Sequence, residues 1–472
     1  MTDVAGGLER YFATWNHLNF YYNVGITGYY ILKPFSSVTS LEKTIYNALA
    51  FVIQKHPILS TVITDADTPA PFFAHLPSFD LKNVVSIIER QKPYPSGNGR
   101  DVELDELLET PHNEAFENDK SNSTPFWRLL ILTNPIKGGD HAFTASFVYH
   151  HSICDGSSGL IFHQHFLEAL NSSRIPHLRS AIMKTAKTEL MPEIEKMIRF
   201  PVSFKKLLKT FVENKFPSLP RGVWAGGAVA TTGERHFRSF TISPEVTSGF
   251  IAACKSNGTT VQATLQVLAA ASLFSILPPK FKRLDCTVAV SLRRFLDGPV
   301  TDSQMGTFNS SAFDHYERSA FETGGFRWNE AHRARDVVAA YMESKGKDDL
   351  IGLLRYVGNY EKFCWDRVGK PRLAAFEISN IGAFKKEPEA TDGKPVLESE
   401  HDGLEWSMGR MIFSQSAGVM SAAILVSVVT GGDGCLTLGF AWQERIVDQK
   451  IVEAMMNKMQ KGLMALGSPS SG

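Results

Sequence analysis

Two adjacent histidines, a cysteine and an aspartate lie within six residues in the stretch YHHSICDGSSG, from Tyr149 to Gly159. Histidine titrates near neutral pH, so it can take a proton from a substrate or bind a metal ion. Cysteine can act as a nucleophile when a base activates it. The stretch therefore raises four readings: a metal site, a cysteine–histidine pair, a general base, or an ordinary strand end with Asp155 as a helix cap.

The metal reading draws on four histidines within sixteen residues, because His163 and His165 follow His150 and His151. Adjacent residues of a strand point to opposite faces, so His150 and His151 cannot easily share one ion. Residues two apart on a helix are about 200° apart, so His163 and His165 diverge as well. We expect no metal site.

The nucleophile readings are also weak. His151 is three residues from Cys154, but the side chains of a turn diverge, and a small buried thiol is the ordinary role of cysteine. A serine hydrolase would need G-x-S-x-G, whereas Gly156–Gly159 reads G-S-S-G.

The surrounding pattern places this stretch between a strand and a helix. Residues 125–133 and 141–150 read as strands, and apolar residues recur at helical spacing after Gly159. In the second half, helices are expected near 247–254 and 261–277, and strands over 285–295 and 373–380. The glycine-rich run 431–434 predicts a hairpin before a last helix from Asp448.

The length of 472 residues, 43% of them hydrophobic, is enough for two cores. We expect domains over 1–175 and 236–472, joined by a proline-rich connection over 176–235. Within that connection, residues 203–216 place apolar side chains on one face of a helix and lysines on the other. The preferred reading is a helix that packs its apolar stripe on a domain. The alternative is a weak peripheral contact with a membrane.

The 49 basic and 49 acidic residues balance, so no global charge favours nucleic acid, and no nucleic-acid partner is expected. The N-terminus lacks the pattern of a secretory signal, and the apolar runs 265–277 and 417–429 are short for a membrane span. Five separated cysteines suit free thiols. We expect a cytoplasmic monomer, with the periphery of the endoplasmic reticulum or of a lipid droplet as the alternative location.

The run HHSICDG resembles the H-H-x-x-x-D-G signature of the coenzyme-A-dependent acyltransferases, which include chloramphenicol acetyltransferase, condensation domains and the plant BAHD enzymes. LERYFATWNHLNFYYNVGITGYYIL, HPIL, PFWRL, VAVSLRRF, ISNIG, FSQS and LGFAWQERIVD, in this order, resemble landmarks of the fungal alcohol O-acetyltransferase family. The D-F-G-W-G motif of the BAHD branch is absent.

The resemblance implies an α/β fold with mixed sheets: two chloramphenicol-acetyltransferase-like domains with a tunnel between them. The second half has histidines at 236, 315, 332 and 401, none in a comparable motif, so one active site is expected. His151 would be the general base for direct attack of the acceptor on the thioester, without a covalent acyl-enzyme. Acetyl-coenzyme A, or another acyl-coenzyme A, would be a co-substrate, and no permanently bound cofactor is implied.

Asp155 has two readings. It could be hydrogen-bonded to the base, as in a serine protease triad. The resemblance implies instead that it pairs with an arginine and fixes the turn, and Arg293 is the candidate, with Arg294 as the alternate. Gly156 would let the backbone pass close to the substrate.

Four further residues are candidates for binding the oxyanion or the acyl group: Ser379, Asn380, Ser414 and Ser416. Asn380 has an alternative role in a turn. His150 either supports the backbone, which is preferred, or lines the tunnel. Nothing in the sequence assigns residues to the phosphates of coenzyme A.

The function expected is transfer of an acyl group, in the first place acetyl, from coenzyme A to the hydroxyl of a small or medium alcohol or natural product in fungal secondary metabolism. Alternatives are a carrier-protein thioester as donor, an amine as acceptor, or a non-catalytic binding protein.

Overall fold

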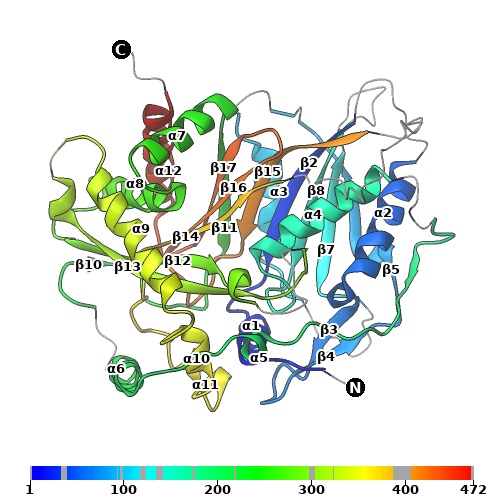
Figure 1. Cartoon of the computed structure of the whole chain (residues 1–472), viewed down its shortest axis with the longest axis horizontal. Coiled ribbons are helices and arrows are strands. Elements are labelled where there is room, and N and C mark those ends of the chain that lie inside the picture. The colour runs from blue at the N-terminus through cyan, green and yellow to red at the C-terminus, as the bar shows by residue number, and fades with distance from the viewer. Residues whose placement is uncertain are drawn as a thin grey trace.

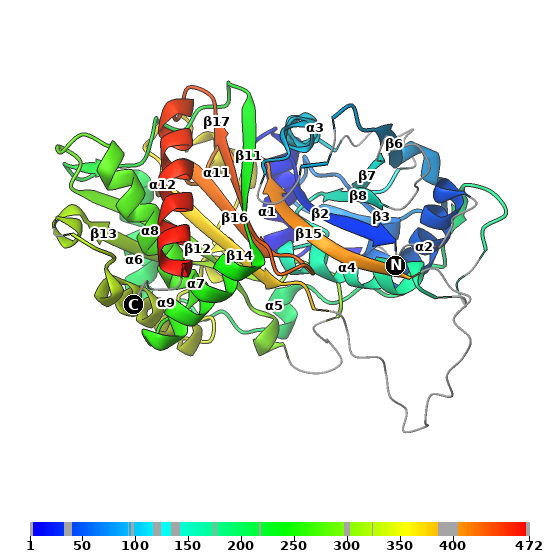
Figure 2. The same cartoon turned by 90° about the horizontal axis from the view of Figure 1, so that it is seen from above.

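The computed structural model describes residues 3–468 except 33–39, 93, 96–98, 117–123, 134–141, 173–174, 176, 217–218, 297–302, 323 and 386–404. Two large sheets lie side by side, each with helices packed against it (Figure 1, Figure 2). Three positions that figured in the sequence predictions lie outside the described residues: His141, Pro176 and His401.

The first sheet has the strand order β15-β2-β8-β7-β6, antiparallel except for the parallel pair β6 and β7. Its strands are β2 (Val24–Leu32), β6 (Val85–Glu89), β7 (Trp127–Thr133), β8 (Ala142–Tyr149) and β15 (Trp406–Gln415). The helices of this half are α1 (Gly7–His17), α2 (Leu41–Lys55), α3 (Val102–His112) and α4 (Gly156–Leu170). Phe143, Phe147 and Tyr149 of β8 are buried on one face, and the alternate residues Thr144, Ser146 and Val148 are buried too, so both faces of this strand are covered.

Two small sheets complete this half. One has the order β1-β4-β3, and the other pairs β5 with β9. The bounds are β1 (Asp3–Val4), β3 (Thr61–Thr64), β4 (Phe72–His75), β5 (Ser78–Asp80) and β9 (Ile182–Lys184), with short 3-10 helices η1 (Pro57–Ser60) and η2 (Leu81–Asn83).

The second sheet has the order β10-β12-β14-β16-β17-β11, and β13 pairs with β12. Its strands are β10 (Val223–Trp224), β11 (Arg235–Ile242), β12 (Arg283–Ser291), β13 (Asn309–Glu317), β14 (Phe376–Ala383), β16 (Ile424–Thr430) and β17 (Leu436–Gln443). Helices α7 (Pro244–Ser256), α8 (Val261–Ile276) and α12 (Gln449–Gly467) pack together beside it (Figure 2). Residues Phe376, Ile378 and Val426 face these helices in one buried core.

Several short elements connect these parts. They are α5 (Ile194–Met197), α6 (Phe204–Lys215), α9 (Trp328–Glu343), α10 (Leu350–Leu354), α11 (Tyr360–Trp365), η3 (Arg293–Phe295) and η4 (Arg318–Phe321). The predicted strand over 285–295 ends earlier than expected, because the chain turns into η3 after Ser291.

Strand β15 crosses from the second half of the chain into the first sheet, where it pairs with β2 from Trp406 against Leu32 to Gln415 against Val24. A division at 236 therefore does not follow the sheets, because one strand of the first sheet comes from beyond residue 400. Sequence periodicity gives the strand but not its partner, so this crossing could not be predicted.

The glycine run 431–434 does form the hairpin that was predicted. It joins β16 to β17, which pair from Thr430 against Leu436 onward. Gly434 has φ of +80°, a conformation that glycine adopts without strain.

The preferred reading of residues 203–216 is wrong. Helix α6 forms, but among the described residues none of its side chains is buried, and nothing in that part of the chain covers its apolar stripe. Figure 1 shows this helix beside the main body, at the foot of the second half.

Among the described residues, no single helix has the length and apolar composition to cross a membrane. The bent pair of α7 and α8 meets those two criteria together, with an angle of 100° between the helices.

Candidate active site

The histidine motif occupies the turn between β8 and α4, as the sequence predicted. Strand β8 ends at Tyr149 and α4 begins at Gly156. Asp155 is the N-cap of α4, because its side chain accepts a hydrogen bond from the backbone N–H of Ser158 at 2.8 Å. The five residues 150–154 between these elements set the direction of both histidines.

His151 is half-buried, and its ring is stacked on one face, has a second aromatic ring to its side, and is hydrogen-bonded at one nitrogen. Phe12 of α1 stacks on it with ring centroids 3.9 Å apart, and the Tyr21 ring lies 5.8 Å away. Its Nδ1 lies 3.1 Å from the backbone carbonyl oxygen of Cys154. A carbonyl can only accept, so Nδ1 carries the hydrogen and the neutral ring has its lone pair on Nε2.

The electrostatics of the site keep His151 neutral. Burial lowers the pKa of the ring below its usual value, and backbone carbonyls and the Asp155 carboxylate oppose this only in part. Within the described chain, no hydrogen bond engages Nε2. A neutral imidazole with a free Nε2 is the form that can accept a proton.

His150 is buried and faces the other way, as adjacent residues at a strand end should. Its Nδ1 accepts a hydrogen bond from the backbone N–H of Ser152 at 3.0 Å, and its ring stacks on Phe126. Burial lowers the pKa of His150 to about 3. This geometry gives His150 a part in the shape of the turn.

Asp155 is surrounded by hydrogen-bond donors, and His151 is not among them. Its Oδ1 accepts from Ser158 N–H and from Arg293 Nη2 at 2.9 Å, and the Ser158 hydroxyl also lies 2.9 Å away. Its Oδ2 accepts from Phe308 N–H at 3.1 Å. The carboxylate therefore pairs with Arg293, and the triad-like reading does not fit the geometry.

The pair of Asp155 and Arg293 is buried, with side chains 2% and 6% exposed. Burial alone would raise the pKa of the carboxyl, but the charge of Arg293 and the hydrogen bonds from Arg293 and Ser158 outweigh it and hold the pKa below its usual value. Arg294 is exposed, so it is not the partner. Arg293 also donates to the carbonyl of Gln304 at 2.6 Å, so the pair fastens the motif to the segment before β13.

Gly156 lies close to side chains of the protein itself, whereas the sequence predicted that its backbone would lie close to the substrate. A Cβ atom built on it would lie 2.6 Å from Cγ2 of Ile381 in β14 and 3.6 Å from Phe413 in β15. The absence of a side chain lets the start of α4 meet both sheets.

Three of the four candidates for binding the oxyanion or the acyl group make hydrogen bonds elsewhere, although no bond from the Nδ2 amide of Asn380 is found among the described residues. Asn380 Oδ1 accepts from the backbone N–H of Gly382 at 2.9 Å, which makes a turn. The hydroxyls of Ser414 and Ser416 donate to the carbonyls of Gly25 and His112. Ser379 makes no hydrogen bond through its hydroxyl among the described residues, and it lies on the same face of β14 as Ile381, which contacts the motif at Gly156.

Tyr21 and Gln415 are site residues that the sequence analysis missed. The Tyr21 hydroxyl donates to Gln415 Oε1 at 3.1 Å, and Gln415 Nε2 donates to the Ser427 hydroxyl at 3.0 Å. This series of hydrogen bonds starts at Tyr21, beside the His151 ring, and ends at Ser427 on β16. The sequence did hold a signal for Gln415. Consecutive residues of a strand point to opposite faces, so in FSQS the side chain of Gln415 points away from the face that carries Ser414 and Ser416, the two residues that were predicted.

Glu377 is a second missed residue, two positions from Ser379 on the same face of β14. Its carboxylate accepts from the Thr287 hydroxyl at 3.0 Å, and within the described chain no lysine, arginine or histidine forms an ion pair with it. Burial raises the pKa of Glu377 above its usual value, and the bond from Thr287 opposes this. The side chain presents an acceptor at the junction of the two sheets.

The other two histidines of the cluster, His163 and His165 in α4, are buried and contact neighbouring protein groups. His163 lies between the Tyr30 hydroxyl and the carbonyl of Ile26, and His165 contacts His56 at 2.7 Å. Cys154 is buried, which raises the pKa of its thiol well above its usual value. In the described part of the chain, no three histidine, cysteine, aspartate or glutamate side chains gather as a metal site would require.

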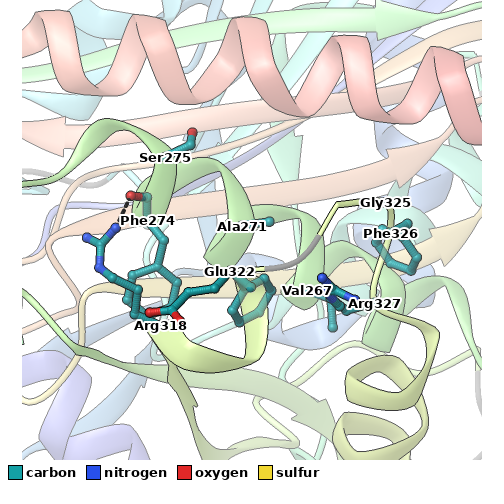
Figure 3. Close-up of a pocket in the computed structure, with 10 residues that line it drawn as sticks. Val267, Ala271, Phe274, Ser275, Arg318, Glu322, Gly325, Phe326 and Arg327 are labelled. Carbon is teal, nitrogen blue, oxygen red and sulfur yellow. Dashed lines mark hydrogen bonds between the residues drawn. The ribbon is translucent and has the colours of Figure 1, made fainter. Parts of the chain in front are cut away.

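A cavity of about 260 Å³ between α8 and η4 is remote from this chemistry. Figure 3 shows its lining, with Phe274 and Phe326 at its ends. The guanidinium of Arg318 there donates to the carbonyls of Phe274, Leu277, Pro278 and Phe281 and so holds the turn after α8. The cavity lies on the helix-covered side of the second sheet, away from His151.

Two mixed α/β halves, with the HHSICDG motif at the turn between β8 and α4, are the architecture of the chloramphenicol-acetyltransferase-like class. The expected fold class is thereby confirmed, because two solved structures share the fold over nearly the whole chain. The trichothecene 15-O-acetyltransferase TRI3 from Fusarium sporotrichioides has a TM-score of 0.67 at 12% identity, over 98% of this chain and 94% of that one. The first condensation domain of the calcium-dependent antibiotic synthetase has a TM-score of 0.63 at 12% identity, over 100% and 97%.

The chain belongs to the alcohol acetyltransferase family, whose model matches residues 4–463. A relative from Aspergillus fumigatus, named "Probable alcohol acetyltransferase crmB", is 33% identical over 97% of both chains. The family resemblance found in the sequence is confirmed, and the protein is an acyltransferase.

Proposed function

We propose that this protein transfers an acetyl group from acetyl-coenzyme A to the hydroxyl of a small or medium alcohol, with His151 as general base. The observation that carries the proposal is the state of the His151 ring. The bond from Nδ1 to Cys154 leaves Nε2 as the unprotonated nitrogen, and burial lowers the pKa so that the ring is neutral at pH 7.

The reaction follows from this tautomer. The acceptor hydroxyl gives its proton to Nε2 as its oxygen forms a bond to the thioester carbonyl carbon. The tetrahedral oxyanion then collapses, the C–S bond breaks, and the proton on Nε2 passes to the departing sulfur to give free coenzyme A. His151 ends the cycle as it began, and no covalent acyl-enzyme forms.

Ser379 is the proposed donor to the oxyanion. Its hydroxyl is the one among the three predicted serines that stays unengaged within the described residues, and it lies on the face of β14 that meets the motif at Gly156. One hydrogen bond to the developing oxyanion is worth about 10²- to 10³-fold in rate. We therefore expect Ser379→Ala to lower kcat by that factor while leaving the fold intact.

The test measures release of free coenzyme A from acetyl-coenzyme A with a panel of alcohols, using a thiol reagent. All five cysteines of the protein are buried, so the folded enzyme should give little background. His151→Ala should lower kcat about 10²- to 10⁴-fold. His315→Ala is the matched control, because His315 is exposed on β13.

Full turnover by a folded His151→Ala protein would refute the assigned base. Absence of turnover by the wild type with every alcohol, together with turnover on an amine or on a carrier-protein thioester, would refute the proposed acceptor or donor. Binding of acetyl-coenzyme A without any transfer would indicate a non-catalytic protein.

A further inference from the structure

Helix α6 carries the most exposed apolar surface of the described chain. Among the described large apolar side chains, the three most exposed are Phe204 at 80%, Phe216 at 67% and Phe211 at 64%, all in or directly after this helix. Leu208 is exposed as well. Apolar side chains gathered in this way on a surface indicate an interaction site.

The exposed residues form one stripe. Phe204, Leu208 and Phe211 are spaced by four and three residues, so they lie above one another on one face of the helix. Lys205 and Lys209 lie at the side of this face. The Lys215 amine reaches over the rings of Phe211 and Phe216, at 5.9 and 5.7 Å from their centroids, and so keeps its charge near the apolar face.

The helix is positive. Residues 204–215 contain four lysines and one glutamate, a net charge of +3 on a chain whose total charge is zero. Glu213 is already near a lysine, because its carboxylate lies 3.7 Å from the Lys209 amine. The surface that complements this helix is therefore apolar at its centre and anionic at its edge.

The start of α6 is fixed to the body, so the stripe has a defined orientation. Ser203 caps the helix, and its backbone N–H and hydroxyl donate to the carboxylate of Asp348 at 2.6 and 3.0 Å. Phe200, three residues earlier, is buried in a small core with Ile351. The start of the helix is thus anchored, while the helix itself is set apart from the main body in Figure 1.

A second copy of this chain is a poor occupant. Two α6 stripes face to face would bring their lysines together, and a helix of 12 residues is only about 18 Å long. A stable protein interface buries about 1,200–2,000 Å², more than so short a helix presents. An anionic bilayer matches both features, because phenylalanines insert at the level of the headgroups and lysines contact their charges.

We propose that α6 binds in the plane of an anionic phospholipid surface, with Phe204, Leu208, Phe211 and Phe216 inserted and the lysines at the headgroups. The proposal is independent of the chemistry at His151, which lies on other elements. It makes the protein a peripheral membrane enzyme that is held by one internal helix.

The test is flotation of the purified full-length protein with vesicles of phosphatidylcholine, with or without phosphatidylserine. We expect the bound fraction at low salt to be about tenfold higher with phosphatidylserine, and to fall as salt is added. The double variant Phe204→Ser/Phe211→Ser should lose binding to both kinds of vesicle. Lys205→Glu/Lys209→Glu should lose the preference for phosphatidylserine.

Phe313→Ser is the matched control, because Phe313 is an exposed phenylalanine on β13 and its loss should leave flotation unchanged. Release of coenzyme A with a water-soluble alcohol should be the same for all variants, which shows that they are folded. The proposal is overturned if the wild type does not float, or if the double variant floats as well as the wild type. It is also overturned if the wild type is a dimer in solution that the double variant converts to a monomer.

Discussion

The buried pair of Asp155 and Arg293 allows a sharp test with Asp155→Asn. All the groups around this carboxylate are donors: Arg293 Nη2 and Ser158 at one oxygen, and Phe308 N–H at the other. Wherever the asparagine places its NH₂ group, a donor faces a donor. Asparagine still caps a helix well, so the cap of α4 is not the main loss.

The magnitude follows from burial. Removing one member of a buried ion pair costs about 3–5 kcal/mol, because the other charge is left in the interior without its partner. At about 2 °C of Tm per kcal/mol for a large chain, Asp155→Asn should lower Tm by roughly 6–10 °C. Asp448→Asn is the matched control: it makes the same change at the exposed N-cap of α12, where the carboxylate forms no ion pair with an arginine among the described residues, and should leave Tm nearly unchanged.

The assay combines thermal unfolding with the rate of coenzyme A release. In a double-mutant cycle with Arg293→Leu, the two changes should couple by about 1–3 kcal/mol, since both disrupt one pair. Activity should fall together with stability. A protein that keeps its wild-type Tm and yet loses about 10⁴-fold in kcat would behave like a triad mutant and would refute the structural role.

Four further outcomes are expected. Because burial lowers the pKa of His151, the acid limb of kcat/KM should lie below pH 6.5, and a limb at or above that pH would contradict the assignment. Burial lowers the pKa of five histidines in the folded protein to about 3 or 4, so below pH 6.5 the unfolded state binds more protons and stability falls as the pH drops towards 4. Each histidine contributes about 1.4 kcal/mol per pH unit, so acid unfolding followed by circular dichroism should have its midpoint at about pH 5–6. A protein that is still folded at pH 4 would refute this. Gly156→Ala should lower the free energy of unfolding by about 1–3 kcal/mol, and adding Ile381→Ala should restore part of it, which urea titration would measure. Glu377→Gln should raise KM for acceptors that carry a second hydroxyl or an amine and leave KM for a simple aliphatic alcohol unchanged; equal effects on both would exclude a role in acceptor recognition.

The sequence predicted the strand, turn and helix around His151 because each has a local cause. Alternating apolar residues specify β8, and Asp155 at the N-cap specifies the start of α4. The partner of Asp155 was found through the family motif VAVSLRRF. That motif offered Arg293 and Arg294, which both lie in the short helix η3, and the burial of Arg293 against the exposure of Arg294 distinguishes them.

The rest of the site depends on contacts that no local pattern encodes. Tyr21, Gln415 and Ser427 meet beside His151 although they belong to distant segments, and the first is 394 residues from the second. Phe12 stacks on the histidine from the N-terminal helix. The apolar stripe of α6 was visible in the sequence, but its exposure depends on the absence of a neighbouring surface, which periodicity does not report.

The crossing of β15 into the first sheet has a consequence for biosynthesis. Gly25 and Ser414 face each other across this sheet although they are 389 residues apart. At about 5–20 residues per second, the ribosome needs roughly 20–80 s to deliver β15 after β2 has emerged. During that time β2 presents an open edge on which other nascent chains could add. Fragments that end before residue 406 should therefore aggregate, and efficient production should require chaperones that cover this edge until translation is nearly complete.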